Sequence, residues 1–448
     1  MIIKNGKVVL HNIIKVKDIK IENGKISRID DSICANKGEE LINANGRYVL
    51  PGFIDIHTHL DDTIGEFPLA DDFHKGSIIA ALNGVTSIYN FITERYDRPL
   101  KYAIEEFTKK AKKSVVNYGF HLTPINFNKK DKDFIKRLID AGFNSFKFYT
   151  TYRDAGLYMD YEKIENIVKE IMTDKTLFLV HCEDDKILSE YYCFQYSKPI
   201  DHLTFRPKEA EVVAIKRIIQ ISRASNARFH VVHCSSKEGV ESIKCSRDNI
   251  KVTVETCPQY LVLHSDLLQG ENGHRFFCTP PIRDKENMLS LRQMAQEGLF
   301  DIFASDHAPF TKEDKDKNRK NLRKTPNGLP GIGALPHIIY KILREKHKAP
   351  YLELSKRLSE NPSKIMNLFP DKGVIQEGAD ADIVIISESK RANKIIPTLS
   401  NSYNPYKTFY SNLKFDYVII GGTVVVKNGI IINYNHKGRC LNDKSKGI

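Results

Sequence analysis

Eight short apolar segments alternate with amphipathic stretches through the middle of the chain, and this alternation constrains the fold more than any other feature. Amphipathic stretches such as 160–174 and 207–224 carry interspersed charges and are typical of surface helices. Eight strands, each followed by room for a helix, predict a (β/α)8 barrel. The alternative is an open doubly wound sheet, but no glycine-rich phosphate loop follows the first strand. The expected strands span residues 48–60, 84–91, 118–125, 143–150, 176–184, 228–236, 251–260 and 300–310.

The two ends of the chain share a different pattern, in which short alternating strands are separated by tight turns. Asn-Gly and Gly-Gly dipeptides favour hairpin turns because both residues tolerate positive φ. The expected turns are Asn5-Gly6, Asn23-Gly24, Gly421-Gly422 and Asn428-Gly429. We therefore expect a small β-sandwich built from residues 1–50 and 372–448, beside a barrel domain over residues 51–371. The length of 448 residues suits one large barrel with a smaller companion domain.

The composition predicts a folded chain, since 41% of the residues are hydrophobic and 28% are charged. No apolar run approaches the ~20 residues that cross a bilayer. The N-terminal segment lacks the features of a signal peptide, so we expect a cytoplasmic protein with no membrane partner. The eight cysteines include no CxxC pair, which favours free thiols in a reducing cytoplasm.

The net charge of +12, from 68 Lys and Arg against 56 Asp and Glu, raises the question of nucleic-acid binding. The lysines are spread along the whole chain, often beside acidic residues, as in segment 312–320. A solvated basic surface explains this pattern, and no nucleic-acid motif accompanies it. We therefore expect no nucleic-acid partner.

Polar side chains gather at the carboxyl ends of the expected strands, which is where active sites lie in such barrels. His57 and His59 share one face of the first strand because residues i and i+2 of a strand point the same way. Imidazole and carboxylate ligands suit Zn²⁺, with Mn²⁺ or Co²⁺ as alternatives. A single strand histidine is more often a core residue, but a convergent set favours a metal site. The candidate ligands are His57, His59, Lys147, His181, His233 and Asp306.

Lys147 differs from the other candidates because it lies within an apolar, aromatic strand. Burying an ammonium group there would be costly. One interpretation is a lysine that extends its amino group to the rim of the barrel. The other is a lysine that loses its charge, either as a neutral amine or by taking up CO₂ as a carbamate that can bridge two cations.

A set of motifs along the chain resembles the cyclic amidohydrolases, and within them most of all the dihydropyrimidinase/hydantoinase family. The motifs are PGFIDIHTHLD (51–61), SFKFYTTY (145–152), VHCED (180–184), VHCSS (232–236), ETCPQYL (255–261), CTPPIRDKEN (278–287), SDHAPF (305–310), PNGLPG (326–331), GVIQEGADADIVI (373–385) and SYNPY (402–406). The resemblance covers nearly the whole chain. It also implies a homo-oligomer, typically a tetramer.

Carried over residue by residue, the resemblance implies a site with two divalent metal ions, Zn²⁺ in the first place. His57, His59 and Asp306 would hold the more buried ion, His181 and His233 the more exposed ion, and a carbamylated Lys147 would bridge the two. A metal-bridging hydroxide would then attack the ring amide of a small cyclic ureide and yield an N-carbamoyl amino acid.

The resemblance also implies roles for four residues around the substrate. Asp306 would shuttle the proton from the hydroxide to the departing ring nitrogen, and Tyr152 would stabilise the oxyanion. Thr279 and Asn327 would hydrogen-bond the ureide. Tyr152 could equally be a packing aromatic, and Asn327 a turn residue before Gly328.

Other members of the superfamily remain as alternatives. Allantoinases fit segments 252–261 and 278–287 equally well, whereas PNGLPG and SYNPY favour the dihydropyrimidinase side. A dihydroorotase would need an arginine where Asp61 stands, and Asp61 would repel a substrate carboxylate. A non-catalytic family scaffold would lack metal ligands, which are all present here. The chain departs from the hydantoinase pattern in FYTTY (148–152) and at Gly333, where an acidic residue is common.

Overall fold

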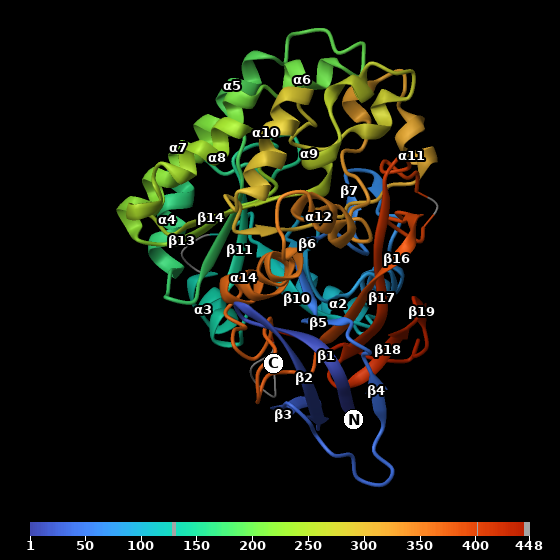
Figure 1. The fold of residues 1–448 in the computed structure, drawn as a ribbon. Coiled ribbons are helices and arrows are strands. Elements are labelled where there is room, and N and C mark those ends of the chain that lie inside the picture. The colour runs from blue at the N-terminus through green and yellow to red at the C-terminus, as the bar shows by residue number, and fades with distance from the viewer. Residues whose placement is uncertain (128–130, 401, 443–448) are drawn as a thin grey trace.

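The computed structural model describes residues 1–127, 131–400 and 402–442, and its centre is an eight-stranded parallel barrel (Figure 1). Neighbouring strands pair in parallel from β6 to β15 in chain order. The sheet closes through a parallel bridge between Thr58 and His307, beside which the His59 N–H donates to the His307 carbonyl (2.8 Å). The strands are β6 (Phe53–Thr58), β9 (Val85–Thr93), β10 (Asn117–Thr123), β11 (Ser145–Tyr149), β12 (Leu177–His181), β13 (Arg228–Val231), β14 (Val252–Thr256) and β15 (Ile302–Phe303). The predicted barrel is confirmed, and the open sheet is excluded.

Helices follow every barrel strand and cover its outside. The expected helix near 160–174 is α4, whose buried residues Ile164, Ile167, Val168 and Ile171 form one stripe at helical spacing. The Asp160 side chain caps it by accepting from the Lys163 N–H (2.7 Å). The helices are α1 (Phe73–Leu82), α2 (Leu100–Ala111), α3 (Lys132–Asp140), α4 (Tyr161–Ile171), α5 (Asp185–Glu190), α6 (Asp201–Phe205), α7 (Lys208–Ser225), α8 (Lys237–Lys244), α9 (Pro258–Val262), α10 (Lys285–Gln296), α11 (Lys312–Lys317), α12 (Leu335–Arg344), α13 (Pro350–Ser355) and α14 (Asn361–Ile365).

A second, mostly antiparallel sheet is built from both ends of the chain, as predicted. Figure 1 shows the N-terminal strands in blue at the bottom of the molecule, and the C-terminal strands β16 and β17 in red along the right of the barrel. β5 pairs with β16, which joins the two ends, and the sheet has its own apolar core that includes Ile19, Val49 and Ile383. The strands are β1 (Ile2–Leu10), β2 (Ile13–Glu22), β3 (Lys25–Asp30), β4 (Leu41–Asn43), β5 (Tyr48–Pro51), β16 (Ile383–Lys394), β17 (Tyr410–Ile420), β18 (Thr423–Lys427) and β19 (Ile430–Ile431).

Two details of the strand predictions were wrong. Asn5-Gly6 does not turn a hairpin but forms a bulge inside β1, where Asn5 has φ 56° and a Cβ on Gly6 would lie 2.6 Å from Val49. The expected strand 48–60 divides at Gly52 into β5 and β6, because the backbone there packs directly on Thr86. The other three expected turns connect strands as predicted.

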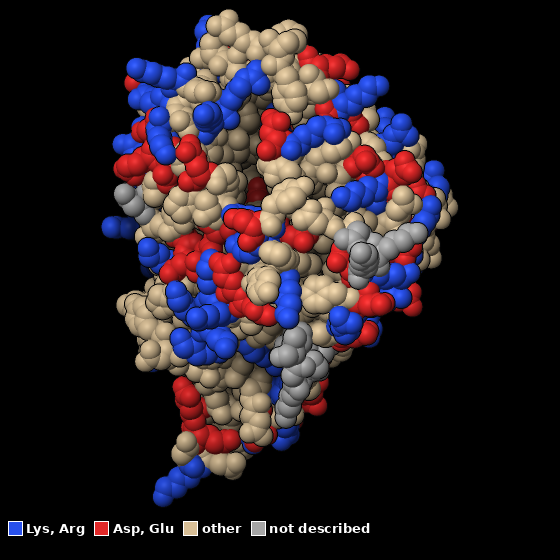
Figure 2. Space-filling model, turned by 180° about the vertical axis from the view of Figure 1, so that it is seen from behind, with Lys and Arg blue, Asp and Glu red and all other residues tan. Residues whose placement is uncertain are grey.

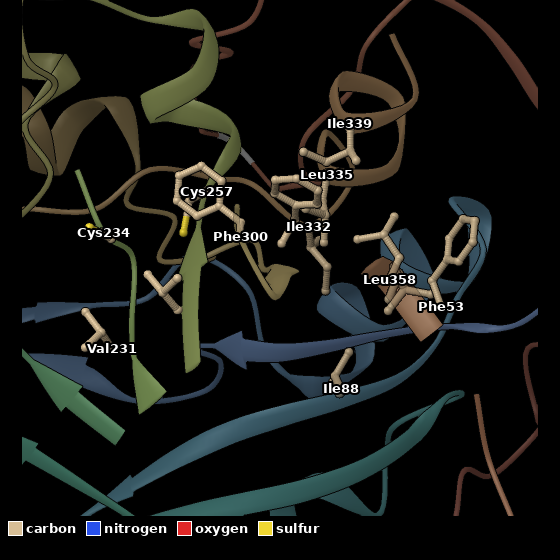
Figure 3. Close-up of a cluster of buried hydrophobic side chains, with 14 of the residues drawn as sticks. Phe53, Ile88, Val231, Cys234, Cys257, Phe300, Ile332, Leu335, Ile339 and Leu358 are labelled. Atoms are coloured by element: carbon tan, nitrogen blue, oxygen red, sulfur yellow. The ribbon is translucent and has the colours of Figure 1, made fainter. Parts of the chain in front are cut away.

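The main hydrophobic core lies between the barrel strands and the helices around them. Figure 3 shows Ile332, Leu335 and Ile339 grouped beside Phe300, with Cys257 of the barrel nearby. This packing fixes the strand ends from which the site residues project.

The distribution of surface charge and the burial of the cysteines agree with what the sequence predicts. Basic and acidic side chains are interspersed over the face in Figure 2. All eight cysteines lie in the described residues and form no disulfide there, and Cys182, Cys234 and Cys257 are buried as expected. Among the helices of the described residues, none has the length and apolar character that crossing a membrane requires.

Candidate active site

Three candidate metal ligands meet where β6 and β15 end. His57, His59 and Asp306 offer ligand atoms that all lie within 4.8 Å of one another. Asp306 Oδ1 is 3.1 Å from His57 Nε2 and 3.5 Å from His59 Nε2. The carboxylates of Glu255 and Asp306 outweigh burial and raise the pKa of His57 to about 9, so the field at this point favours a positive charge. Two imidazoles and one carboxylate are a fitting donor set for Zn²⁺.

His181 and His233, at the ends of β12 and β13, form a second group beside the first. His181 Nδ1 lies 2.9 Å from His233 Nε2, and the rings of His57 and His233 are 5.3 Å apart between centroids. Burial lowers the pKa of His181 to about 4 and also lowers the pKa of His233. Both side chains are therefore neutral at neutral pH, which is the form that binds metal ions.

Lys147 projects from β11 into the same space and does not reach the rim. Its side chain is 1% exposed, and Nζ lies over the rings of Phe91 (5.3 Å) and Tyr149 (5.1 Å). Within the described residues Nζ has no hydrogen-bond partner. Burial lowers the pKa of Lys147 to about 8, which makes a neutral amine accessible. Its burial excludes the interpretation in which the lysine extends to the rim, and the orphaned amino group fits a residue completed by a bound group.

Glu255, for which the sequence predicted no role, orients two of the histidines from β14. Its carboxylate accepts from His57 Nδ1 (2.5 Å), from His230 Nε2 (3.0 Å) and from the His233 N–H (3.0 Å). This leaves His57 Nε2 directed at Asp306. Although burial opposes its charge, His57 and His230 hold the pKa of Glu255 below its ordinary value. The sequence signal was present, because Glu255 is a lone carboxylate in an apolar strand.

Glu183 orients His181 in the same way, and the sequence predicted no role for Glu183 either. His181 Nε2 lies 2.7 Å from Glu183 Oε2, so the Nδ1 atom is left to face His233. Arg206 holds the other side of this buried carboxylate with Nε (3.1 Å) and Nη2 (2.6 Å). The Arg206 guanidinium also lies 5.1 Å from the Tyr152 ring. The spacing of two residues from His181 was the available signal, since it places both side chains on one face.

Several site residues have backbone conformations that side chains rarely adopt. Tyr152, His233 and Asp306 have φ values of 70°, 40° and 47°. Such conformations persist where the surrounding structure holds a side chain in place, and they cluster at functional sites. Tyr152 stands 5.1 Å from the His181 ring between centroids and lines the same cavity as the histidines.

A cavity of about 680 Å³ opens onto these groups. Thr279 and Asn327 line it, and Thr279 Oγ1 and Asn327 Oδ1 are buried without hydrogen-bond partners among the described residues. Buried polar atoms are normally paired, so these two atoms are available to a ligand in the cavity. All nine residues predicted for the site line this one cavity: His57, His59, Lys147, Tyr152, His181, His233, Thr279, Asn327 and Asp306.

The carboxylate of Asp61, which we expected to repel a substrate carboxylate, does not line the cavity. Lys110 Nζ lies 3.7 Å from Asp61 Oδ1 and donates to the Asp61 carbonyl (2.8 Å). The next residue, Asp62, does line the cavity, and its carboxylate pairs with Arg95 (2.9 Å). The departure at Gly333 has a local cause, because a Cβ there would lie 2.2 Å from the Ile396 carbonyl oxygen.

The fold and the site define an α/β-barrel protein with a metal-ligand cluster at its strand ends, and comparisons with known proteins place it further. A model described as the amidohydrolase family matches residues 48–425. A D-hydantoinase of Geobacillus stearothermophilus is 33% identical over 423 residues, covering 91% of this chain and 88% of the relative. A D-hydantoinase of Ralstonia pickettii is 28% identical, covering 98% of each chain. The crystal structure of a dihydropyrimidinase from Brevibacillus agri NCHU1002 superposes with a TM-score of 0.92 at 30% identity, covering 99% of this chain and 98% of that one.

The chain therefore belongs to the amidohydrolase family, and its similarity is to hydantoinases and dihydropyrimidinases. It is a hydrolytic enzyme. The resemblance inferred from its motifs is confirmed.

Proposed function

We propose that this enzyme hydrolyses the ring amide of a cyclic ureide, a dihydropyrimidine or a hydantoin, to an N-carbamoyl amino acid. One observation carries the proposal: six groups suited to metal binding converge at the base of a cavity whose wall holds two unpaired polar atoms. A ureide ring presents N–H and C=O groups along one edge, and Thr279 and Asn327 can pair with both kinds. The names of the relatives support the same chemistry.

The residues fit two divalent metal ions, with Zn²⁺ as the expected metal. His57, His59 and Asp306 would hold one ion, and His181 through Nδ1 and His233 through Nε2 the other. Lys147, carbamylated, would bridge them, which gives its orphaned amino group a role. When bound, such ions make hydroxide available at neutral pH and polarise a carbonyl group.

The side chains of the chain supply the remaining steps. Asp306 accepts the proton of the attacking water and delivers it to the departing ring nitrogen. Tyr152 donates a hydrogen bond from its hydroxyl group to the carbonyl oxygen as negative charge develops there. Arg206, stacked near its ring and fixed by Glu183, keeps Tyr152 in place. Thr279 and Asn327 hold the ureide edge so that the reacting carbonyl faces the metal ligands.

Hydrolysis of four ureides by the zinc-loaded enzyme tests the proposal. Dihydrouracil, hydantoin, allantoin and dihydroorotate are compared side by side at neutral pH, and turnover led by dihydrouracil or hydantoin is expected. A lead for allantoin would assign the site to an allantoinase instead. No turnover of any of the four with both metals bound would overturn the ureide proposal.

The assembly and the domain division extend the same proposal. We expect a cytoplasmic homo-oligomer, a tetramer by the resemblance, in which residues 1–50 and 372–448 form one domain and 51–371 the other. Light scattering after gel filtration tests the oligomer: a tetramer mass is expected, and a monomer mass at assay concentrations would contradict it.

A further inference from the structure

Lys315 is a second lysine buried near the cavity, and nothing in the proposed reaction uses it. It lies in α11 with no exposed surface, and its Nζ atom is 5.7 Å from the Phe310 ring centroid. Among the described residues it forms no ion pair with a carboxylate. Within the described part of the chain, the one hydrogen bond of its Nζ atom goes to the Phe277 carbonyl (2.8 Å). Burial lowers the pKa of Lys315 to about 7, which reflects the cost of placing an amino group here.

The Phe277 carbonyl is the point where two segments of the cavity wall meet. It accepts from Lys315 Nζ and also from the Gly328 N–H (2.9 Å). Phe277 stands two residues before Thr279, and Gly328 directly follows Asn327. The next residue of α11, Asp316, accepts from His274 (2.7 Å) and Arg275 (2.6 Å). The helix is therefore also hydrogen-bonded to the segment that leads into Thr279.

Space filling does not account for a lysine at this position. An apolar side chain of similar length, such as methionine, would occupy the same volume without burying an amino group. Gly328 itself is confined, because a Cβ there would lie 2.6 Å from the Ala308 carbonyl oxygen. The amino group therefore adds a directed bond to the one carbonyl that joins both segments.

We propose that Lys315 is a positioning residue for substrate recognition, which holds the segments of Thr279 and Asn327 at the separation that matches a ureide edge. This inference rests on the proposed function of the two side chains. Lys315 does not line the cavity, and among the described residues its Nζ atom forms no hydrogen bond or ion pair with a metal ligand. Its effect is therefore on binding geometry: the two unpaired polar atoms drift apart when the bond to Phe277 is lost.

The test compares Lys315→Met with Lys312→Met, the same change at an exposed lysine of the same helix. For the ureide that the wild-type enzyme turns over best, the KM of Lys315→Met should rise about tenfold, while kcat and metal content stay within about threefold. Lys312→Met should match the wild type. When Asn327→Ala is introduced into both the wild type and Lys315→Met, the difference in KM between them should largely vanish, because the effects of coupled residues are not additive.

The outcomes separate this inference from the proposed function. An unchanged KM in Lys315→Met, or a KM effect that simply adds to that of Asn327→Ala, overturns the role of Lys315 and leaves ureide hydrolysis standing. A wild-type enzyme that turns over none of the four ureides overturns both. If Lys315→Met does not fold, Lys315→Gln keeps a neutral donor on a shorter side chain. Lys315→Gln should then show a raised KM with normal metal content, and a wild-type KM in this variant would refute the inference.

Discussion

Replacing Glu255 by glutamine should weaken metal binding by about tenfold, and the structure gives the reasons for this size. The glutamine oxygen can still accept from His57 and His233, while its amide group faces His230. His230 can carry its hydrogen on Nδ1, which lies 2.8 Å from the Thr253 hydroxyl. Its Nε2 atom can then accept from the glutamine amide. The hydrogen bonds are then kept, and the charge is lost.

The loss of the negative charge of Glu255 determines how far the metal affinity falls. A hydrogen bond to a charged group is worth about 1.5–3 kcal/mol and a neutral one about 1 kcal/mol, so the bond to His57 loses roughly 0.5–2 kcal/mol. That corresponds to about 2- to 30-fold in affinity. The range overlaps the 10- to 100-fold losses that are typical when a partner of a metal ligand is changed.

Competition with a chromogenic chelator measures the zinc affinity of Glu255→Gln directly. Glu211→Gln is the matched control, because Glu211 is equally buried but its hydrogen bonds go to Ser235 (2.8 and 3.1 Å). The control should keep the wild-type affinity. An affinity of Glu255→Gln within twofold of wild type, or the same loss in both variants, would refute the reasoning.

Two further substitutions test the roles proposed for single residues. Lys147→Ala should lose both metal and activity, and a short carboxylic acid added to it should restore part of each; full metal content by atomic absorption would argue against the bridge. Asp306→Asn should lower kcat by roughly a thousandfold with a much smaller change in KM, as expected for a lost proton shuttle. A nearly unchanged kcat in steady-state assays would remove Asp306 from that role.

The barrel was predictable because its evidence is repeated along the chain. Eight strands at regular spacing made the fold class insensitive to an error in any one of them. The local errors came from tertiary contacts that the sequence does not display. Asn5-Gly6 has the chemistry of a turn, but β1 continues through it because Gly6 packs on Val49. Gly52 likewise divides one expected strand between two sheets.

The residues of the site could be predicted from the sequence, but the hydrogen bonds that orient them could be predicted less well. Residues at strand ends of one barrel must converge, so the ligand candidates could be assembled without coordinates. Glu255 and Glu183 escaped notice because their importance lies in which ring nitrogen they face, and this depends on side-chain orientation. Asp61 was misplaced for the same reason, since its carboxylate lies 3.7 Å from Lys110 Nζ and does not line the cavity.

Metal titration of activity tests the central claim most directly. The enzyme is stripped with a chelator, reloaded with increasing Zn²⁺ in the presence of bicarbonate, and assayed with the ureide it turns over best. The account predicts no turnover in the stripped protein and activity that rises until two ions are bound per chain. Full turnover by the metal-free enzyme would contradict it.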